Sequence, residues 1–207
     1  MQDLTEAPED KWNPRNILAV TEHRISTPLT EDAIAGLRAG DNVLITGSLL
    51  TARDEAHKRL SRLLREGREL PVDLKGQVIY YVGPTPPRPG RPVGSAGPTS
   101  SYRMDAYTPA LLALGLKGMI GKGQRGPEVR KAILEHGAVY LAAVGGAGAL
   151  LSMRIESVEV AAYPELGPEA IYRMHVRDFP CIVINDIHGG DLYREGKQKY
   201  RKAEMTR

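Results

Sequence analysis

The stretch Gly97-Pro98-Thr99-Ser100-Ser101-Tyr102-Arg103-Met104-Asp105 gathers three hydroxyl side chains, an arginine and an acid within nine residues. Its glycine and proline end the preceding element, and any of the three hydroxyl residues can cap a helix running from 99 to 114. Such a helix start would surround one small volume with free N–H groups, hydroxyls and a guanidinium, which suits a carboxylate or phosphate. Taken alone, the stretch is equally consistent with an ordinary capped helix and a surface arginine.

Size and composition favour one large α/β domain with tails, since 207 residues exceed one typical domain but fall short of two. A hydrophobic content of 42% and a charged content of 26% are ordinary, while 5% aromatic residues offer no stacking platform for bases. The net charge of +3 is only mildly basic, and several cations lie between Arg194 and Arg207. We therefore expect no nucleic-acid partner.

A single cysteine, Cys181, excludes an internal disulfide and any cysteine-rich metal site built by this chain alone. Its apolar, strand-like neighbours from Phe179 to Ile184 predict a buried structural thiol. The first residues lack the basic and apolar regions of a signal peptide, and the longest apolar stretch, Ala138 to Leu151, is broken by glycines and too short to span a bilayer. These features predict a cytoplasmic protein with no membrane partner.

Along the chain, residues 1–16 predict a polar N-terminal arm in which Trp12 docks, residues 17–193 the domain, and residues 194–207 a basic tail. Apolar runs predict strands at 17–20 with 24–25, 41–46, 76–82, 118–121, 138–143, 157–162, 172–176 and 181–185, with a turn at 47–48. Helices are expected at 30–37, 52–66, 99–114, 127–137 and after the glycines at 145–148. Strands alternate with helices in the first part of the chain, and strands follow one another in the last part. This order indicates an α/β or α+β domain with a mixed sheet.

Two further motifs carry polar side chains near predicted strand ends. Arg53 and His57 share a helix face, which alone predicts a solvated surface. The glycines around Lys122 let the backbone approach a ligand while the ammonium supplies charge, and Arg125 follows as a possible further contact. Neither this loop nor the turn at 145–148 has the spacing of a nucleotide-binding loop, so no nucleotide site is predicted. Neither His175 nor His188 has partners at metal-ligand spacing, so no metal site is predicted.

Four stretches, in order along the chain, resemble one family. They are 47–59, 97–105, 121–123, and 163–170 with 178–180. Over roughly 29–193 the chain resembles the C-terminal domain, or separate β subunit, of class I iron–sulfur fumarate hydratases and L-tartrate dehydratases. The resemblance implies a single swivelling β/β/α domain with a mixed sheet and flanking helices.

The resemblance also implies roles for site residues. Arg53, Arg103 and Lys122 would bind the substrate carboxylates, and Thr99 would be the base on the carbon acid. From its place in the same motif, Asp105 is expected to activate Thr99. The resemblance gives His57 no role, and its place in the helix predicts that it orients Asp54 or Arg53; Arg88 and Arg91 receive no role. A [4Fe–4S] cluster needs about three cysteines, so the resemblance implies that a separate α subunit carries it, in an α2β2-type assembly.

The expected function is that of a β subunit of fumarate hydratase, which interconverts fumarate and (S)-malate. The closest alternative is the β subunit of L(+)-tartrate dehydratase, which forms oxaloacetate, and no residue of this chain decides between the two substrates. An alternative of another class is a non-catalytic dicarboxylate-binding or assembly module.

Overall fold

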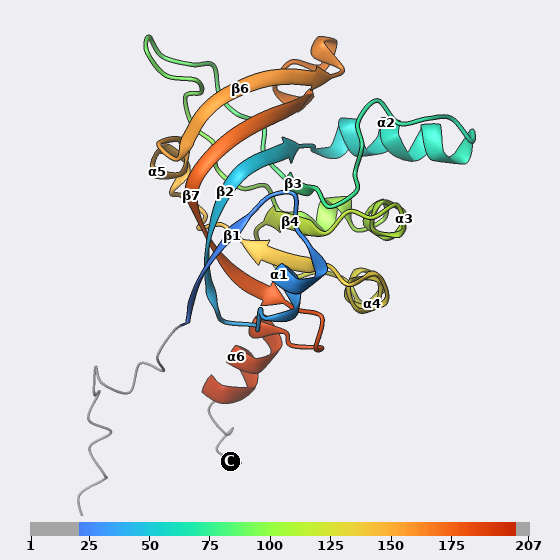
Figure 1. The fold of residues 1–207 in the computed structure, drawn as a ribbon, viewed down its shortest axis with the longest axis vertical. Helices are drawn as coiled ribbons and strands as arrows, with labels where there is room; N and C mark the ends of the chain where they lie inside the picture. Colours follow the sequence, from blue (N-terminus) through green and yellow to red (C-terminus); the bar gives the residue numbers. More distant parts are fainter. Residues whose placement is uncertain (1–20, 202–207) are drawn as a thin grey trace, which may run out of the picture.

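The computed structural model describes residues 21–201, and a seven-stranded sheet organises them (Figure 1). In chain order the elements are β1 (Glu22–Ser26), α1 (Glu31–Ala35), β2 (Asn42–Thr51), α2 (Asp54–Arg65), β3 (Val78–Tyr80), the 3₁₀ helix η2 (Ser101–Met104), α3 (Thr108–Ala113), β4 (Gly118–Gly121), α4 (Pro127–His136), β5 (Val139–Ala142), α5 (Gly148–Ser152), β6 (Ile155–Ala162), the 3₁₀ helix η3 (Pro164–Glu169), β7 (Ile171–Asn185) and α6 (Leu192–Tyr200). The mixed α/β domain with flanking helices that the sequence predicts is confirmed.

Long strand β7 closes the sheet on itself. The strand order is β1-β2-β3-β4-β5-β7-β6, and β1 to β5 run parallel to one another. β7 runs antiparallel to β5 and β6, and along most of its length it also pairs antiparallel with β2. Strands β2, β3, β4, β5 and β7 therefore form a closed barrel, with β1 and β6 as additions.

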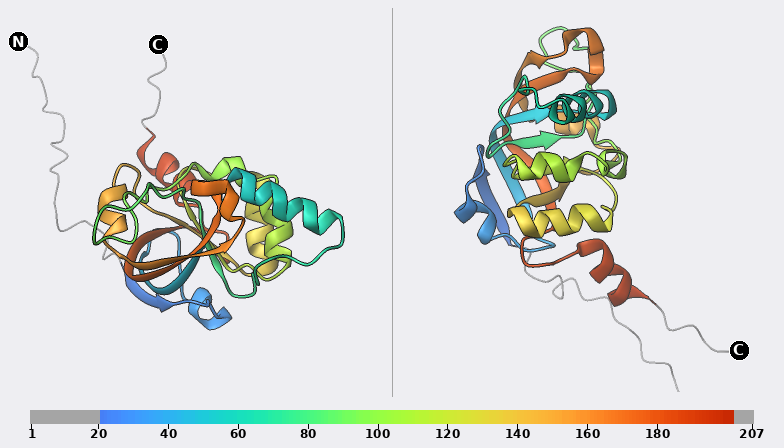
Figure 2. Two further views of the ribbon diagram at one scale, coloured as in Figure 1. Left: turned by 90° about the horizontal axis from the view of Figure 1, so that it is seen from above. Right: turned by 90° about the vertical axis from the view of Figure 1, so that its right-hand side faces the viewer.

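Helices α2, α3 and α4 lie side by side along one side of the sheet (Figure 2). α2 has acidic residues in its first turn and Gly67 just beyond its end, with φ of 64°. α4 begins with Pro127 and ends at Gly137, whose left-handed φ of 58° confirms the predicted stop. The apolar faces of these helices pack on the sheet around Leu60, Leu112 and Ile133.

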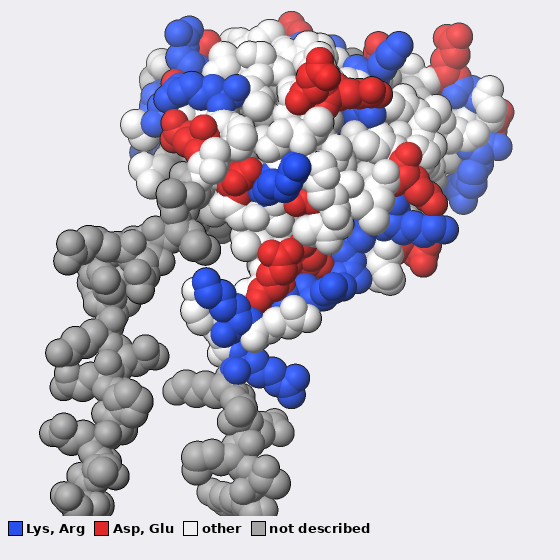
Figure 3. Space-filling model, turned by 60° about the horizontal axis from the view of Figure 1, so that its bottom comes forward, with Lys and Arg blue, Asp and Glu red and all other residues white. Residues whose placement is uncertain are grey.

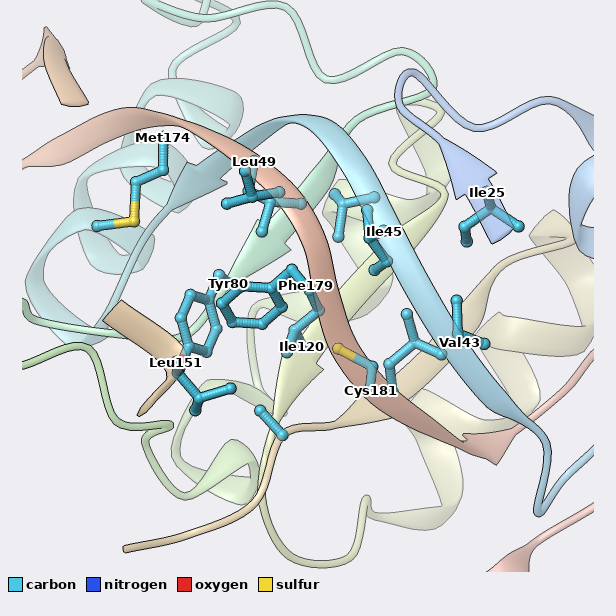
Figure 4. Packing of buried hydrophobic residues seen from close by; sticks show 14 of the residues in the cluster. Ile25, Val43, Ile45, Leu49, Tyr80, Ile120, Leu151, Met174, Phe179 and Cys181 are labelled. Carbon is cyan, nitrogen blue, oxygen red and sulfur yellow. The ribbon is translucent and has the colours of Figure 1, made fainter. Parts of the chain in front are cut away.

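A second core fills the inner side of the curved sheet (Figure 4). Tyr80 and Phe179 meet edge to face there, with ring centroids 5.2 Å apart. Cys181 lies in the same cluster and is buried, as predicted, and burial raises the pKa of its thiol.

Two strand predictions are wrong in their limits. The predicted turn at 47–48 is a bulge inside β2, where Gly47 has φ of 122° and the register with β7 shifts. The strands predicted at 172–176 and 181–185 are one strand, β7, whose Asp178 has φ of 47° and donates its N–H to Thr46 Oγ1 at 3.1 Å. Pairing between β2 and β7 continues on both sides of these irregular residues, so each remains one strand.

The helix predicted over 99–114 is also wrong. Residues 99–100 are extended, η2 covers four residues, and α3 starts only at Thr108. The backbone of Thr99 bonds to two strand ends instead, because its N–H donates to Tyr81 O at 2.7 Å and its carbonyl accepts from Lys122 N at 3.2 Å. Thr99 is therefore not at a helix start.

The ends of the chain bear on three further expectations. The predicted strand at 17–20 and the docking of Trp12 lie outside the described residues. α6 crosses the expected boundary between domain and tail at 193, so the first part of the predicted tail is helical; the domain division itself stays a prediction. No helix between residues 21 and 201 is long and apolar enough to cross a membrane. On the face that carries α6, acidic and basic side chains are interspersed (Figure 3).

Replacing Cys181 by serine should destabilise the fold. The thiol is buried among apolar side chains, so a hydroxyl there would cost about 1–3 kcal/mol of unfolding free energy unless it found a partner. Urea unfolding of Cys181→Ser beside Cys181→Ala separates this cost from the loss of sulfur volume. A serine variant as stable as the wild type would contradict the buried, apolar role.

Candidate functional site

The carboxyl ends of the parallel strands β2 to β5 meet at one edge of the sheet, the usual place for ligands in such sheets. Arg53 follows β2, Gly83 lies just beyond β3, Lys122 follows β4 and Gly145 lies just beyond β5. A Cβ placed on Gly145 would lie 3.6 Å from Lys122 Cδ, so the last two connections are in contact. We call this edge the strand-end site.

The hydroxyl-rich stretch enters this site between the ends of β3 and β4. Ser101 N–H donates to Lys122 O at 2.9 Å, which continues the pairing that Thr99 makes with Tyr81 and Lys122. Ser101 is buried, and its Oγ lies 2.9 Å from the hydroxyl of Tyr140, which donates to Gly123 O at 2.7 Å. Thr99 is thus held half-buried beside the exposed Lys122.

Gly121 makes this insertion possible. A Cβ at this position would collide with Ser101 Oγ and would lie 2.9 Å from Tyr81 Cδ2. Only glycine lets the inserted segment lie so close to the end of β4. In the Gly-Lys-Gly motif, the first glycine is therefore needed for packing, and the lysine supplies a charged group.

Arg103 forms a two-point ion pair with the first residue of α2. Its Nε donates to Asp54 Oδ1 at 2.9 Å, and its Nη2 lies 2.7 Å from Asp54 Oδ2. The side chains are 39% and 33% exposed, so the pair is open to solvent and to ligands. This contact ties η2 to α2.

Arg53 lies on the other side of the same helix start. Its Nη2 is 3.5 Å from Glu169 Oε1, and a Cβ on Gly83 would lie 2.6 Å from its Nη1. Glu169 also accepts a hydrogen bond from Glu55 N at 3.0 Å, so it satisfies a free N–H in the first turn of α2. The motif at 163–170 thereby positions both the helix and Arg53.

Asp105 points away from these cations toward a buried arginine. Its Oδ1 accepts from Arg125 Nε at 2.7 Å, and its Oδ2 accepts from Gly126 N at 2.6 Å. Arg125 also donates to the Tyr81 hydroxyl at 3.0 Å and to Thr108 Oγ1 at 2.7 Å. Its side chain is fully buried, and although burial works against the charge, Tyr81 and Asp105 raise the pKa of Arg125.

His57 is buried beneath the start of α2. Its Nδ1 lies 2.8 Å from Arg53 O, and its ring meets Tyr81 edge to face at 5.4 Å. Burial lowers the pKa of His57 from 6.5 to about 4, so the ring is neutral at pH 7. With Nδ1 donating to Arg53 O, His57 supports the backbone at Arg53, and its other nitrogen has no partner among the described residues.

Four of the five predicted residues, Arg53, Thr99, Arg103 and Lys122, thus lie along the strand-end site, while Asp105 turns inward to Arg125. Their chemical roles stay predictions. Sequence reasoning missed Asp54 and Glu169, which pair with the two arginines. The three cations and these two acids leave a net charge of +1, which favours anionic ligands.

The described residues do not fit an iron–sulfur cluster. They contain no group of three or more histidine, cysteine or acidic side chains arranged to hold a metal ion. Cys181, the one cysteine of the chain, lies in β7 and is buried among the apolar side chains of the inner core.

Comparison with known proteins gives consistent results. A family model described as "Fumarase C-terminus" matches residues 1–196. The anaerobic class I fumarate hydratase of Escherichia coli is 41% identical over 153 residues, covering 73% of this chain and 28% of that protein. Fumarate hydratase 2 of Leishmania major is 38% identical over 156 residues, covering 74% and 28%. This chain thus spans under a third of the length of these two enzymes.

A shorter relative comes from Methanocaldococcus jannaschii. It is named "Putative L(+)-tartrate dehydratase subunit beta" and is 38% identical over 181 residues, covering 84% of this chain and 93% of that protein.

The pair Asp105–Arg125 should matter more for stability than an exposed pair. Asp105→Asn removes the negative charge that faces a fully buried guanidinium, so we expect a loss of about 3–5 kcal/mol in urea unfolding. The control is Arg24→Gln, which breaks the exposed pair with Asp178 and should cost under about 1 kcal/mol. Equal effects of the two substitutions would show that Arg125 does not depend on Asp105.

Proposed function

Because this chain belongs to the fumarase C-terminus family, we propose that it is the β subunit of a class I fumarate hydratase and supplies the carboxylate-binding half of the active site. The observation that supports the proposal is that Arg53, Arg103, Lys122 and Thr99 all lie along the strand-end site. The family's hydro-lyases act on substrates with two carboxylates, and these cations are donors of the right kind.

In the proposed reaction, the cations hold the substrate and stabilise the charge that develops next to one carboxylate as the proton leaves. Arginine binds carboxylates through two parallel N–H groups, while lysine adds a point charge. Hydrogen bonds to charged groups contribute roughly 1.5–3 kcal/mol each, so two or three such contacts are enough to position a small substrate.

Thr99 is the proposed base. A hydroxyl must lose its proton to act in this way, and neighbouring cations favour the alkoxide. Because Thr99 lies in an extended segment, no helix dipole adds to this effect, and we assign the support to Lys122, whose backbone N–H bonds to Thr99 O. Asp105 stays a proposed activating group, although both of its oxygens already accept hydrogen bonds from Arg125 and Gly126.

The [4Fe–4S] cluster is assigned to a partner α subunit, because the described residues of this chain do not fit it. When bound there, the cluster would serve as the Lewis acid that takes the hydroxyl group. The relative from Methanocaldococcus jannaschii, named as a subunit, supports the division into two chains. We propose a cytoplasmic α2β2-type assembly.

L(+)-tartrate is the second candidate substrate, favoured by the name of the same relative. Tartrate dehydration would use the same cations for the two carboxylates. The two substrates differ by one hydroxyl group, and contacts that distinguish it would lie on the partner subunit.

Reconstitution tests the composite site. We expect the purified chain alone to lack hydro-lyase activity, and activity to appear when it is mixed anaerobically with an iron–sulfur α subunit from the same organism. Fumarate, malate and tartrate are assayed in parallel, and iron is measured in both chains. Activity of this chain alone in metal-free buffer would overturn the proposal, and dicarboxylate binding without turnover in the mixture would favour the non-catalytic module.

Substitutions at Thr99 and Arg103 should separate chemistry from binding. Thr99→Ala should lower kcat of the reconstituted enzyme about a hundredfold or more with little change in ligand affinity, as expected for a positioned base. Arg103→Ala should raise KM as well as lower kcat, since it holds a carboxylate throughout. Thr99→Ser is the matched control and should retain more activity than Thr99→Ala. Near-normal turnover of Thr99→Ala would place the base elsewhere.

A further inference from the structure

Asp54 occupies one particular edge of the Arg103 guanidinium. The ion pair uses Nε and Nη2, whose distances to the two carboxylate oxygens are 2.9 and 2.7 Å. A guanidinium has five N–H donors in a planar fork. Within residues 21–201, Asp54 is the acidic partner of Arg103, so the Nη1 group and the outer N–H of Nη2 are left for a second planar acceptor. Arg103 can therefore hold Asp54 and a substrate carboxylate at the same time.

The backbone that carries Asp54 is rigidly supported. Asp54 is the first residue of α2, where a carboxylate is favoured by the free N–H groups and the helix dipole. The next residue, Glu55, donates its backbone N–H to Glu169, and the helix is fixed below by the buried His57 and Leu60. Asp54 is therefore an anchored acceptor rather than a mobile surface acid.

A long arginine side chain loses conformational freedom when it binds a ligand, and a fixed partner removes part of that cost beforehand. The geometry points to Asp54 as the positioning residue for Arg103, which holds the guanidinium with its outer edge free for the carboxylate of a small dicarboxylate. This inference rests on the proposed function. Asp54 also offsets one positive charge, but both side chains are at least a third exposed, so solvent screens that effect and orientation dominates.

The first test needs only the purified chain. In a ¹⁵N NMR spectrum, the Nε–H signal of Arg103, assigned by its loss in Arg103→Lys, should exchange slowly with solvent. Asp54→Asn should make that exchange at least about tenfold faster, because the charge-assisted hydrogen bond is weakened. Glu55→Gln is the matched control: its side chain lies in the same turn but pairs with Lys58, at 3.6 Å. Unchanged exchange in Asp54→Asn would show that Asp54 does not hold Arg103.

The second test uses the reconstituted enzyme and a double-mutant cycle. Asp54→Asn should raise KM for the dicarboxylate about tenfold with a smaller effect on kcat, and should have less than about a twofold effect in an Arg103→Ala background. Thermal midpoints of Asp54→Asn and Glu55→Gln are measured beside the kinetics, so that a loss of folded enzyme is not mistaken for a change in KM. An equal rise in KM in both backgrounds would overturn the inference.

The two tests separate failure of this inference from failure of the proposed function. A wild-type mixture inactive on fumarate, malate and tartrate would refute the proposed function. The NMR exchange rates would still decide whether Asp54 holds the Arg103 guanidinium.

Discussion

The rest of the site depends on the hydrogen bonds of one buried group, the guanidinium of Arg125. A buried cation is costly unless its donors are satisfied, and this one binds Asp105, Tyr81 and Thr108 and lies over the ring of Tyr140 at 5.1 Å. Tyr81 directly follows β3, Tyr140 lies in β5, Thr108 begins α3, and Asp105 lies in the connection before α3. Satisfying one side chain therefore fixes four parts of the chain relative to each other.

That constraint explains how a polar, hydroxyl-rich segment can lie between two strand ends. Asp105 anchors the end of the segment, Ser101 is tied through Tyr140 to the loop after β4, and Gly121 leaves the space it needs. Thr99 is held by its backbone, through hydrogen bonds to Tyr81 and Lys122, and within residues 21–201 its side chain takes no part in this network. A segment held in this way presents functional groups on a rigid support, as a catalytic site requires.

The charged groups are divided between support and recognition. Asp105 and Arg125 lie inward and hold the segment, whereas Arg53, Arg103 and Lys122 are partly or fully exposed at the edge. Each of the two arginines has an acidic partner from the start of α2 or from η3. An open edge of this kind fits a site completed by a second surface, in keeping with relatives of which this chain spans under a third.

The sequence by itself determined the alternation of strands and helices, the buried cysteine and the motifs that carry Arg53, Thr99, Arg103 and Lys122, because apolar periodicity, caps and residue types are local properties. β4, α2 and α4 follow from it almost residue for residue. Only the tertiary structure decided that Thr99 is extended and that Asp105 faces Arg125. A hydroxyl-rich turn can cap a helix when nothing else binds its backbone. Here residues that directly follow β3 and β4 make the backbone hydrogen bonds that a helix would have made. The contacts of Asp54 and Glu169 likewise depend on packing. Asp54 and Arg103 are 49 positions apart in the chain, and Glu169 and Glu55 are 114 positions apart, so no local pattern encodes either contact.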